Sequence, residues 1–336
     1  MPEQTGIAAA PVPVAGMAPA TDPMPASPAM YRFAFAGLLG LALSGCAGLG
    51  TPAADMRLDT VPRTAVISAF QPELTLLLER LQAPRKYSVN GVEFSTGTLE
   101  GKPVVLFLSG ISMTNATMNT QLALDRFKVS HIVFSGIAGG VNPQLHIGDV
   151  SVPVRWGQYL EVLMARESAP DRYALPPGWK SAGMANFGML FPRPVGVRSA
   201  STQGKEEKFW FDADPAMLKV ARNLGSVSLD TCDRAGQCLS TTPRLVVGGN
   251  GVSGQAFVDN AAFREYTFKT FEANVLDMET AAVGMVAYSN GVPYIAFRSL
   301  SDLAGGGEGE NQIGTFFRIA ADNSAKVLLA FLAAWK

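Results

Sequence analysis

Apolar residues follow two patterns that alternate along the chain from about residue 63 onward. Short continuous apolar runs, typical of strands buried on both faces, occupy 64–70, 131–135, 147–152, 242–248 and 294–302. Apolar positions with a period near 3.6, typical of helices, occupy 73–81, 113–127, 214–224, 261–271 and 316–335. Segments 87–97 and 102–109 alternate and are rich in Val, which predicts a hairpin pair. The alternation of strands and helices predicts an α/β domain around a largely buried sheet.

The stretch 156–211 interrupts this alternation. It is rich in Pro, Gly, Met and aromatic residues and has weak periodicity. An ordered loop of that length is usually functional, so we expect a lid or a contact surface.

The first sixty residues do not have the pattern of a folded domain. Residues 1–29 are rich in Ala, Pro and Met and almost uncharged, which predicts disorder or a mis-assigned start, with translation beginning at Met30. Residues 30–46 place a short apolar run behind a basic residue and end in Leu-Ser-Gly-Cys, which predicts a secretory signal. The position of Cys46 resembles the lipobox of bacterial lipoproteins, so we expect lipidation there, a linker over 47–62, and a protein anchored by lipid in the periplasm or outer membrane. The alternative is an ordinary signal peptide with a chance cysteine.

Composition narrows the classes of partner and cofactor. The chain is 48% hydrophobic, enough for a sizeable core, and its net charge of −1 gives no electrostatic footprint for nucleic acid. Its two histidines, His131 and His146, have no cysteines or paired carboxylates near them at metal-site spacing. We therefore expect no metal, no cofactor and structural roles for both histidines.

Two cysteines remain besides Cys46. Cys232 and Cys238 flank a polar, turn-like loop. In an exported protein a local disulfide between them is expected, and two free surface thiols are the alternative.

The most informative chemistry lies in 276–282 and 294–302. The first segment puts Glu279 at the start of an apolar helix, and the second is a buried strand that ends at Asp302. Ligands of open α/β sheets bind where strands end and helices begin. Two carboxylates there suit two tasks, gripping a sugar diol and protonating a leaving base.

Four motifs together carry a resemblance to a known family. They are 66–73 (VISAFQPE), 135–140 (SGIAGG) followed by 147–149, 253–258 (SGQAFV), and the pair Met278-Glu279 with Ser301-Asp302. With them, 63–336 resembles the nucleoside phosphorylase superfamily, and within it the 5′-methylthioadenosine/S-adenosylhomocysteine nucleosidases. The resemblance implies a single three-layer α/β/α domain with a central mixed, twisted sheet and an insertion at about 156–211. Such an insertion in an exported chain is also similar to the plant storage-protein-like members.

The resemblance implies a role for each site residue. Asp302 would protonate purine N7, Glu73 would activate the attacking water, and Glu279 would accept both ribose hydroxyls. The other implied binding residues are Met278 and Phe257 as apolar walls, Val258 at the base edge, Arg298 and Ser301 near the nucleophile, and Gly139 and Ile137 in the glycine turn.

Each residue also has a structural alternative. Glu73 and Glu279 could be first-turn acids that complement a helix dipole. Asp302 could be a turn former before a glycine run, and Phe257 and Met278 could be core.

The nucleophile is predicted to be water. Phosphorylases of this superfamily hold phosphate with arginines and a serine near the glycine turn and the first strand, where this chain has Phe134, Ile137 and an acid, Glu73. A carboxylate beside the anomeric carbon repels phosphate but suits water, although Arg298 leaves phosphorolysis open as the alternative. A second alternative is a catalytically silent nucleoside-binding or storage protein.

Relatives commonly form homodimers or trimers of dimers, so we expect a homodimer in which a residue of the neighbouring subunit closes the pocket. The apolar helix predicted over 113–127 could form the subunit interface or could equally be part of the core.

Overall fold

The computed structural model describes residues 56–233 and 236–336, within one compact unit, Ala54–Lys336. The predicted disordered start, the signal segment and Cys46 lie outside the described residues. The linker expected over 47–62 is too long, because the first strand already begins at Asp59. Arg63 holds that residue with an Nε–Oδ2 distance of 2.6 Å, and Leu58 N–H donates to the Arg126 carbonyl.

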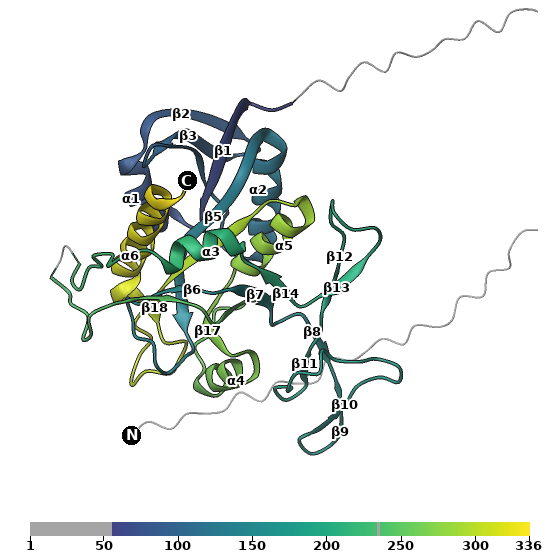
Figure 1. Ribbon diagram of the computed structural model, residues 1–336. Coiled ribbons are helices and arrows are strands. Elements are labelled where there is room, and N and C mark those ends of the chain that lie inside the picture. The colour runs from purple at the N-terminus through teal and green to yellow at the C-terminus, as the bar shows by residue number, and fades with distance from the viewer. Residues whose placement is uncertain (1–55, 234–235) are drawn as a thin grey trace, which may run out of the picture. The chain divides into compact units, whose positions relative to one another are not determined.

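A mixed sheet forms the centre of the molecule (Figure 1), and it has twelve strands among the described residues. They are β1 (Asp59–Ser68), β2 (Gln82–Val89), β3 (Val92–Leu99), β4 (Lys102–Leu108), β5 (Phe127–Gly140), β6 (Val150–Val152), β7 (Arg155–Gln158), β14 (Trp210–Asp212), β15 (Leu245–Val247), β16 (Asn250–Ser253), β17 (Ala273–Asp277) and β18 (Tyr294–Asp302).

The long strand β5 organises this sheet. Its first part pairs in parallel with β1 on one side and β18 on the other, and β4, β3 and β2 continue outward from β1. Its last residues, Gly139 and Gly140, pair antiparallel with β17, which leads to β16, β7 and β14. Near Gly139, strand β5 therefore joins two parts of the sheet: one that contains β1 and β18, and one that begins with β17.

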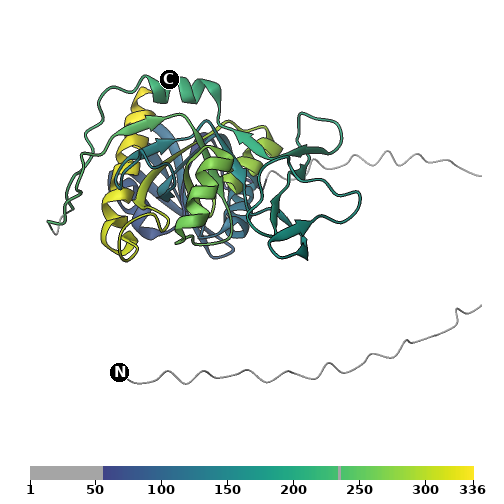
Figure 2. The same ribbon diagram turned by 90° about the horizontal axis from the view of Figure 1, so that it is seen from below.

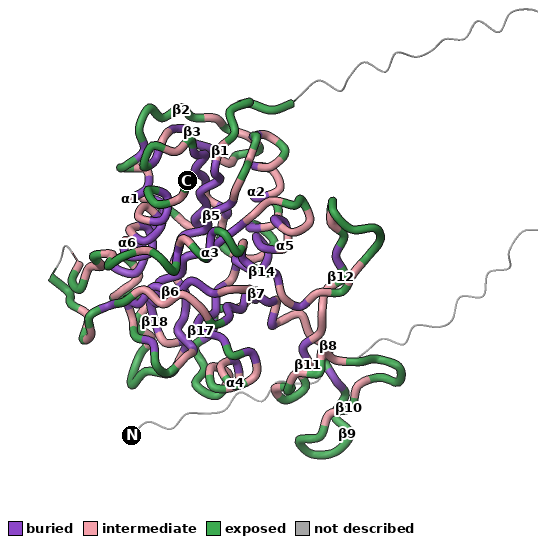
Figure 3. Tube along the Cα trace, viewed as in Figure 1, coloured by how far each residue is buried: buried purple, intermediate pink, exposed green. Residues whose placement is uncertain are grey.

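Helices cover both faces of the sheet (Figures 1 and 2). One apolar core contains side chains of α1 (Gln71–Arg80), α3 (Pro215–Arg222) and α6 (Ile313–Ala334). Another contains α2 (Met113–Arg126) and α5 (Thr280–Asn290), and α4 (Ala261–Phe271) packs with β17 in a third. Every residue of β18 is buried, and Figure 3 shows burial concentrated in the central strands. The predicted three-layer α/β/α fold with a mixed sheet is confirmed.

Two local predictions need correction. Segment 87–97 is not one strand, because Asn90 and Gly91 turn the chain with φ of 51° and 80° between β2 and β3. Two left-handed residues in an Asn-Gly loop are typical of a type I′ hairpin, so β2, β3 and β4 form a meander. The glycine turn 136–140 is also extended, as the end of β5.

The stretch 156–211 is not a structureless loop. Within the described chain it holds three two-stranded sheets, which pair β8 (Val162–Met164) with β11 (Leu190–Pro192), β9 (Arg166–Ala169) with β10 (Arg172–Ala174), and β12 (Val195–Val197) with β13 (Glu206–Lys208). These hairpins project from the body (Figures 1 and 2).

No helix among the described residues is long and apolar enough to cross a membrane. Within the same ranges, no group of three or more His, Cys, Asp or Glu side chains could hold a metal ion. A disulfide bond joins Cys232 to Cys238.

Candidate active site

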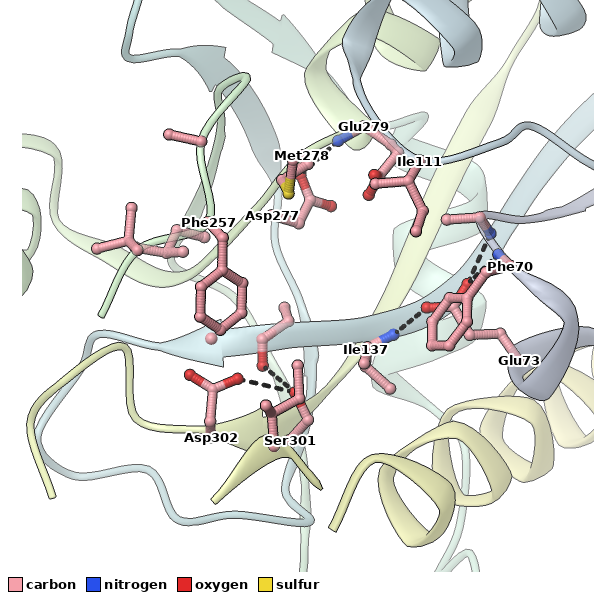
Figure 4. A pocket seen from close by; sticks show the side chains of 17 residues that line it. Phe70, Glu73, Ile111, Ile137, Phe257, Asp277, Met278, Glu279, Ser301 and Asp302 are labelled. Carbon is pink, nitrogen blue, oxygen red and sulfur yellow. Dashed lines mark hydrogen bonds between the residues drawn. The ribbon is translucent and has the colours of Figure 1, made fainter. Parts of the chain in front are cut away.

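A cavity of about 270 Å³ opens where β1, β5, β17 and β18 end. Nine of the predicted site residues line it: Glu73, Ile137, Gly139, Phe257, Val258, Met278, Glu279, Ser301 and Asp302. Figure 4 shows Asp302 and Phe257 at one end, Glu73 and Phe70 at the other, and Glu279 along the side between them. The fold thus brings together residues from five separate segments of the chain.

Glu73 lies in the first turn of α1, and its carboxylate is buried. Oε2 accepts N–H groups from Ala69 at 2.6 Å and Phe70 at 3.3 Å, and Oε1 accepts the Ile137 N–H at 2.8 Å. Burial raises the pKa of Glu73, and the nearby Arg298 guanidinium opposes this rise. The side chain therefore satisfies the amides at the start of its helix and also presents a carboxylate of raised pKa to the cavity, as a general base requires.

Glu279 precedes α5, and its side chain makes no capping hydrogen bond to that helix. Oε1 accepts the Ser112 N–H at 2.9 Å, and Oε2 lies 3.4 Å from Arg298 Nη2. Burial and, next, the charge of Asp277 raise the pKa of Glu279 to about 8. Glu279 therefore lacks the hydrogen bonds of a helix-capping acid.

Asp302 ends β18 and is held by neutral donors. Oδ1 accepts the Ala304 N–H at 2.8 Å and lies 3.5 Å from Asn311 Nδ2, while Oδ2 accepts the Ser301 hydroxyl at 2.9 Å. The bond to Ala304 is the local turn contact expected of an Asp in this position. The same carboxylate lines the cavity, so the two interpretations of Asp302 are compatible.

Arg298 is the one predicted site residue that does not line the cavity. It is 0% exposed and lies behind the wall, with Nη1 3.7 Å from Glu73 Oε1 and Nε 2.8 Å from Asp277 Oδ2. Its guanidinium also lies 4.0 Å from the centroid of the Phe134 ring. Arg298 therefore contacts carboxylates and not the cavity itself.

Gly136 makes this close approach possible. A Cβ atom there would lie 2.1 Å from Arg298 Nη1 and 2.5 Å from Glu73 Oε1. Any larger residue would displace the ion pair, which is a physical reason for glycine in this part of β5.

The remaining walls are mainly apolar, and several were not predicted. Phe257 is 57% exposed and Ile111 51% exposed, so neither is plain core. The lining residues outside the predicted set are Ala69, Phe70, Ile111, Ala138, Ala256, Leu276, Asp277 and Ile313. Ile111 and Ile313 come from segments without a chemical motif, so only the fold identifies them. None of the lining residues belongs to 156–211, where we expected a lid.

The charge of the cavity is one-sided. Four of the described lining residues are acidic, namely Glu73, Asp277, Glu279 and Asp302, and none of them is basic. Such a surface favours neutral or cationic groups over anions.

Comparison with known proteins gives the family. The model of the phosphorylase superfamily matches residues 63–333. A 5′-methylthioadenosine/S-adenosylhomocysteine nucleosidase of Bacillus licheniformis is 29% identical over 273 residues, covering 80% of this chain and 98% of the relative. The nucleosidase of Geobacillus thermodenitrificans is 27% identical over 271 residues, covering 80% and 96%.

Solved structures agree in fold. The nucleosidase from S. pneumoniae, with a transition-state inhibitor, superposes with a TM-score of 0.60 at 24% identity and covers 82% of this chain and 100% of its own. Futalosine hydrolase of Helicobacter pylori gives a TM-score of 0.58 at 22% identity and covers 81% and 97%. The match of the family model over most of the chain is decisive: this protein belongs to the phosphorylase superfamily.

Proposed function

We propose that the protein hydrolyses the N-glycosidic bond of purine nucleosides that resemble 5′-methylthioadenosine. The observation that carries the proposal is the pair of buried carboxylates at opposite ends of one cavity, Glu73 and Asp302, with Glu279 between them. The names of the relatives, 5′-methylthioadenosine/S-adenosylhomocysteine nucleosidases, support the reaction and the substrate class.

In this mechanism Asp302 donates a proton to N7 of the purine. The glycosidic bond then breaks with its electron pair leaving on the base, and the sugar develops oxocarbenium character at C1′. Such general acid assistance is typically worth about 10²–10⁴-fold in rate. The Ser301 hydroxyl and the Ala304 N–H hold the Asp302 carboxylate while its proton leaves.

Glu73 completes the hydrolysis. Its carboxylate removes a proton from a water molecule, whose oxygen forms the new bond to C1′. Burial raises the pKa of Glu73 above its ordinary value, which makes its carboxylate a stronger base toward the water. The products are the free base and the free sugar, and the two protons exchanged by the carboxylates balance.

Glu279 and the apolar walls position the nucleoside. Glu279 is the acceptor for the two ribose hydroxyls, and Phe257 and Met278 contact the base and sugar. The far end of the cavity, beyond the sugar, is lined by Phe70, Ile111 and Ile313. These apolar side chains suit a small apolar 5′ substituent, and the carboxylate of Glu73 near Phe70 would disfavour an anionic one.

Water is favoured over phosphate as the nucleophile. The nearest guanidinium, that of Arg298, lies behind the wall and contacts three carboxylates. Inorganic phosphate would have to displace one of these partners and bind beside the others. The alternative of phosphorolysis therefore lacks a free cation in the described part of the cavity.

The assembly and location are part of the proposal. We expect lipid anchoring at Cys46 after export, which the disulfide between Cys232 and Cys238 supports, since such bonds persist in oxidising compartments. We also expect a homodimer, because Ile111 and Phe257 are exposed at the cavity, where a partner subunit would cover them.

The test is release of free base from 5′-methylthioadenosine, adenosine and inosine, with and without phosphate. Release in phosphate-free buffer is the expected result. Release only with phosphate would make the protein a phosphorylase. Binding without release would favour the silent nucleoside-binding alternative.

A further inference from the structure

Asp277 lies at the end of β17, beside Met278 and Glu279, which the resemblance assigns to an apolar wall and to the ribose hydroxyls. It lines the cavity but is only 5% exposed. Its two carboxylate oxygens are contacted from three directions: they accept hydrogen bonds from the start of α5 and the end of β16, and they form an ion pair with the guanidinium of Arg298 on β18. A buried carboxylate with this many donors is fixed in position.

The first set of contacts caps α5. Oδ1 accepts the N–H groups of Glu279 and Thr280, each at 3.2 Å, and the Thr280 hydroxyl donates to Oδ2. The free amides at a helix start are usually bound by the capping side chain. Asp277 performs that task, which leaves the carboxylate of Glu279 free to reach Ser112 and the cavity.

The second contact fixes Arg298. The distance from Arg298 Nε to Asp277 Oδ2 is 2.8 Å, the shortest of the three ion pairs that this guanidinium makes. The other two nitrogens then point to Glu73, at 3.7 Å, and to Glu279, at 3.4 Å. Arg298 Nε also donates to the Thr280 hydroxyl at 2.9 Å, and that hydroxyl donates in turn to Asp277 Oδ2. A planar guanidinium held at Nε by this pair has little freedom to rotate, so Asp277 and Thr280 together limit where the other two ion pairs form.

The third contact links this cluster to the base end. The Ser253 hydroxyl donates to Asp277 Oδ1 at 2.5 Å and accepts the Ala281 N–H at 2.8 Å. Ser253 ends β16 and starts the segment that leads to Phe257 and Val258. Asp277 is therefore connected to Glu73 through Arg298, to Glu279 through the start of α5, and to the segment that carries Phe257 through Ser253.

We propose that Asp277 is a positioning residue for glycosidic bond cleavage: through Arg298 and the start of α5 it orients Glu73 and Glu279 toward the sugar. This inference rests on the proposed function, since both partners of Asp277 act in that reaction. It also has an electrostatic consequence. Three buried carboxylates surround one guanidinium, so the cluster carries an excess of negative charge whenever all three are ionised.

The charge of Asp277 favours the protonated form of its neighbour. The groups that face Glu279 are Asp277 from β17, Glu73 from α1 and Arg298 from β18, with the Ser112 N–H from the loop before α2. After burial, Asp277 makes the largest contribution to the raised pKa of Glu279. Removing its charge should allow Glu279 to ionise, and thus to accept two ribose hydroxyls, at lower pH.

The experiment compares Asp277→Asn with wild type and with Asp125→Asn, a matched change at an exposed residue of α2. We expect kcat/KM for 5′-methylthioadenosine to fall by about 10–100-fold, the range typical of residues that orient others in a site. We also expect the acidic limb of the pH profile to move to lower pH, while Asp125→Asn changes neither. Asp277→Glu, which keeps the charge, should lose rate but retain the wild-type acidic limb.

Two results would overturn the proposal. One is a folded Asp277→Asn variant with the rate and pH profile of wild type. The other is a variant whose Tm is lowered, whose acidic limb has not moved, and whose lost rate returns in full when the assay is cooled below that Tm. That result would make the role of Asp277 purely structural. If Asp277→Asn does not fold, Ser253→Ala tests the same network, with reduced kcat expected and unchanged kcat contradicting it.

The readout also separates this proposal from the proposed function. If wild type releases no base, the enzyme assignment fails, and adenosine binding measured by calorimetry over the same pH range replaces kcat/KM. Asp277→Asn should then move the pH dependence of the adenosine Kd to lower pH, because Glu279 still holds the sugar. An unchanged pH dependence would contradict the positioning role.

Discussion

The two ends of the cavity hold their carboxylates in different ways. Asp302 is bound by neutral donors from its own segment, the Ala304 N–H, the Ser301 hydroxyl and the Asn311 amide. Glu73 at the other end, Glu279 along the side and Asp277 beside it come from different elements and share the guanidinium of Arg298. Among the described residues Asp302 makes no ion pair, whereas the other three carboxylates share one guanidinium, so a proton gained by one of them alters the others. In the proposed reaction, this difference separates the proton donor from the groups that would hold the sugar and the water.

The largest effect should follow from Asp302→Asn. We expect base release to fall by about 10²–10⁴-fold, since the amide cannot donate the proton that the leaving purine needs. Adenosine binding should stay within a few-fold of wild type. Measurement of kcat alongside the adenosine Kd checks both, and a variant that retains kcat would remove Asp302 from the mechanism.

Glu73→Gln should come next. Without a base for the water we expect kcat to fall by about 10²–10³-fold, with little change in adenosine binding. Glu79→Gln, at an exposed position of the same helix, is the matched control and should behave as wild type. Recovery of activity in Glu73→Gln on addition of phosphate would mean that the carboxylate excludes phosphate and does not activate water.

Glu279→Gln should weaken substrate binding more than the chemical step, with KM raised by about 10-fold or more for loss of a charge-assisted acceptor.

The same substitution should also change how the stability of the protein depends on pH. The folded-state pKa of Glu279, about 8, lies above its ordinary value of 4.5, so the native state binds the proton more tightly than the unfolded state. Wild-type stability should therefore fall as pH rises from about 4.5 to 8, and Glu279→Gln should reduce that fall. Thermal unfolding across this range is the measurement, and equal slopes for the two proteins would contradict the assignment.

The smallest effect on activity is expected from the double change Cys232→Ser, Cys238→Ser. Neither residue lines the cavity, so kcat/KM should not change. Loss of a disulfide that closes a short loop should lower stability by about 2 kcal/mol. A large change in kcat/KM would show that the loop is coupled to the site.

The sequence predicted best those residues whose position follows from the ends of strands. Glu279 and Asp302 adjoin apolar runs, so their place at the edge of the sheet could be predicted, as could the α/β fold. Asn90-Gly91 is a recognised hairpin signal that could have corrected the strand predicted over 87–97. The direction of a side chain is harder to predict: Arg298 is on the expected strand, but its guanidinium points behind the cavity.

Asp277 illustrates the limit of such prediction. It is adjacent to Met278, yet the role of its carboxylate depends on Ser253 and Arg298, which are brought to it only by the packing of β16 and β18. Ile111 and Ile313 likewise reach the cavity from segments with ordinary apolar patterns. Contacts between distant segments were therefore the part that periodicity and motifs could not supply.

Strand β5 connects the two ends of the cavity. The Ile137 N–H binds Glu73, and Gly139 pairs with Asp302 in the sheet register. An extended strand advances about 3.3 Å per residue, so these two anchor points are about 6.6 Å apart. That spacing is fixed by covalent bonds in a buried strand, and thermal motion of loops cannot change it. A single buried strand thus relates the positions of Glu73 and Asp302, the residues proposed to activate water and to protonate the base.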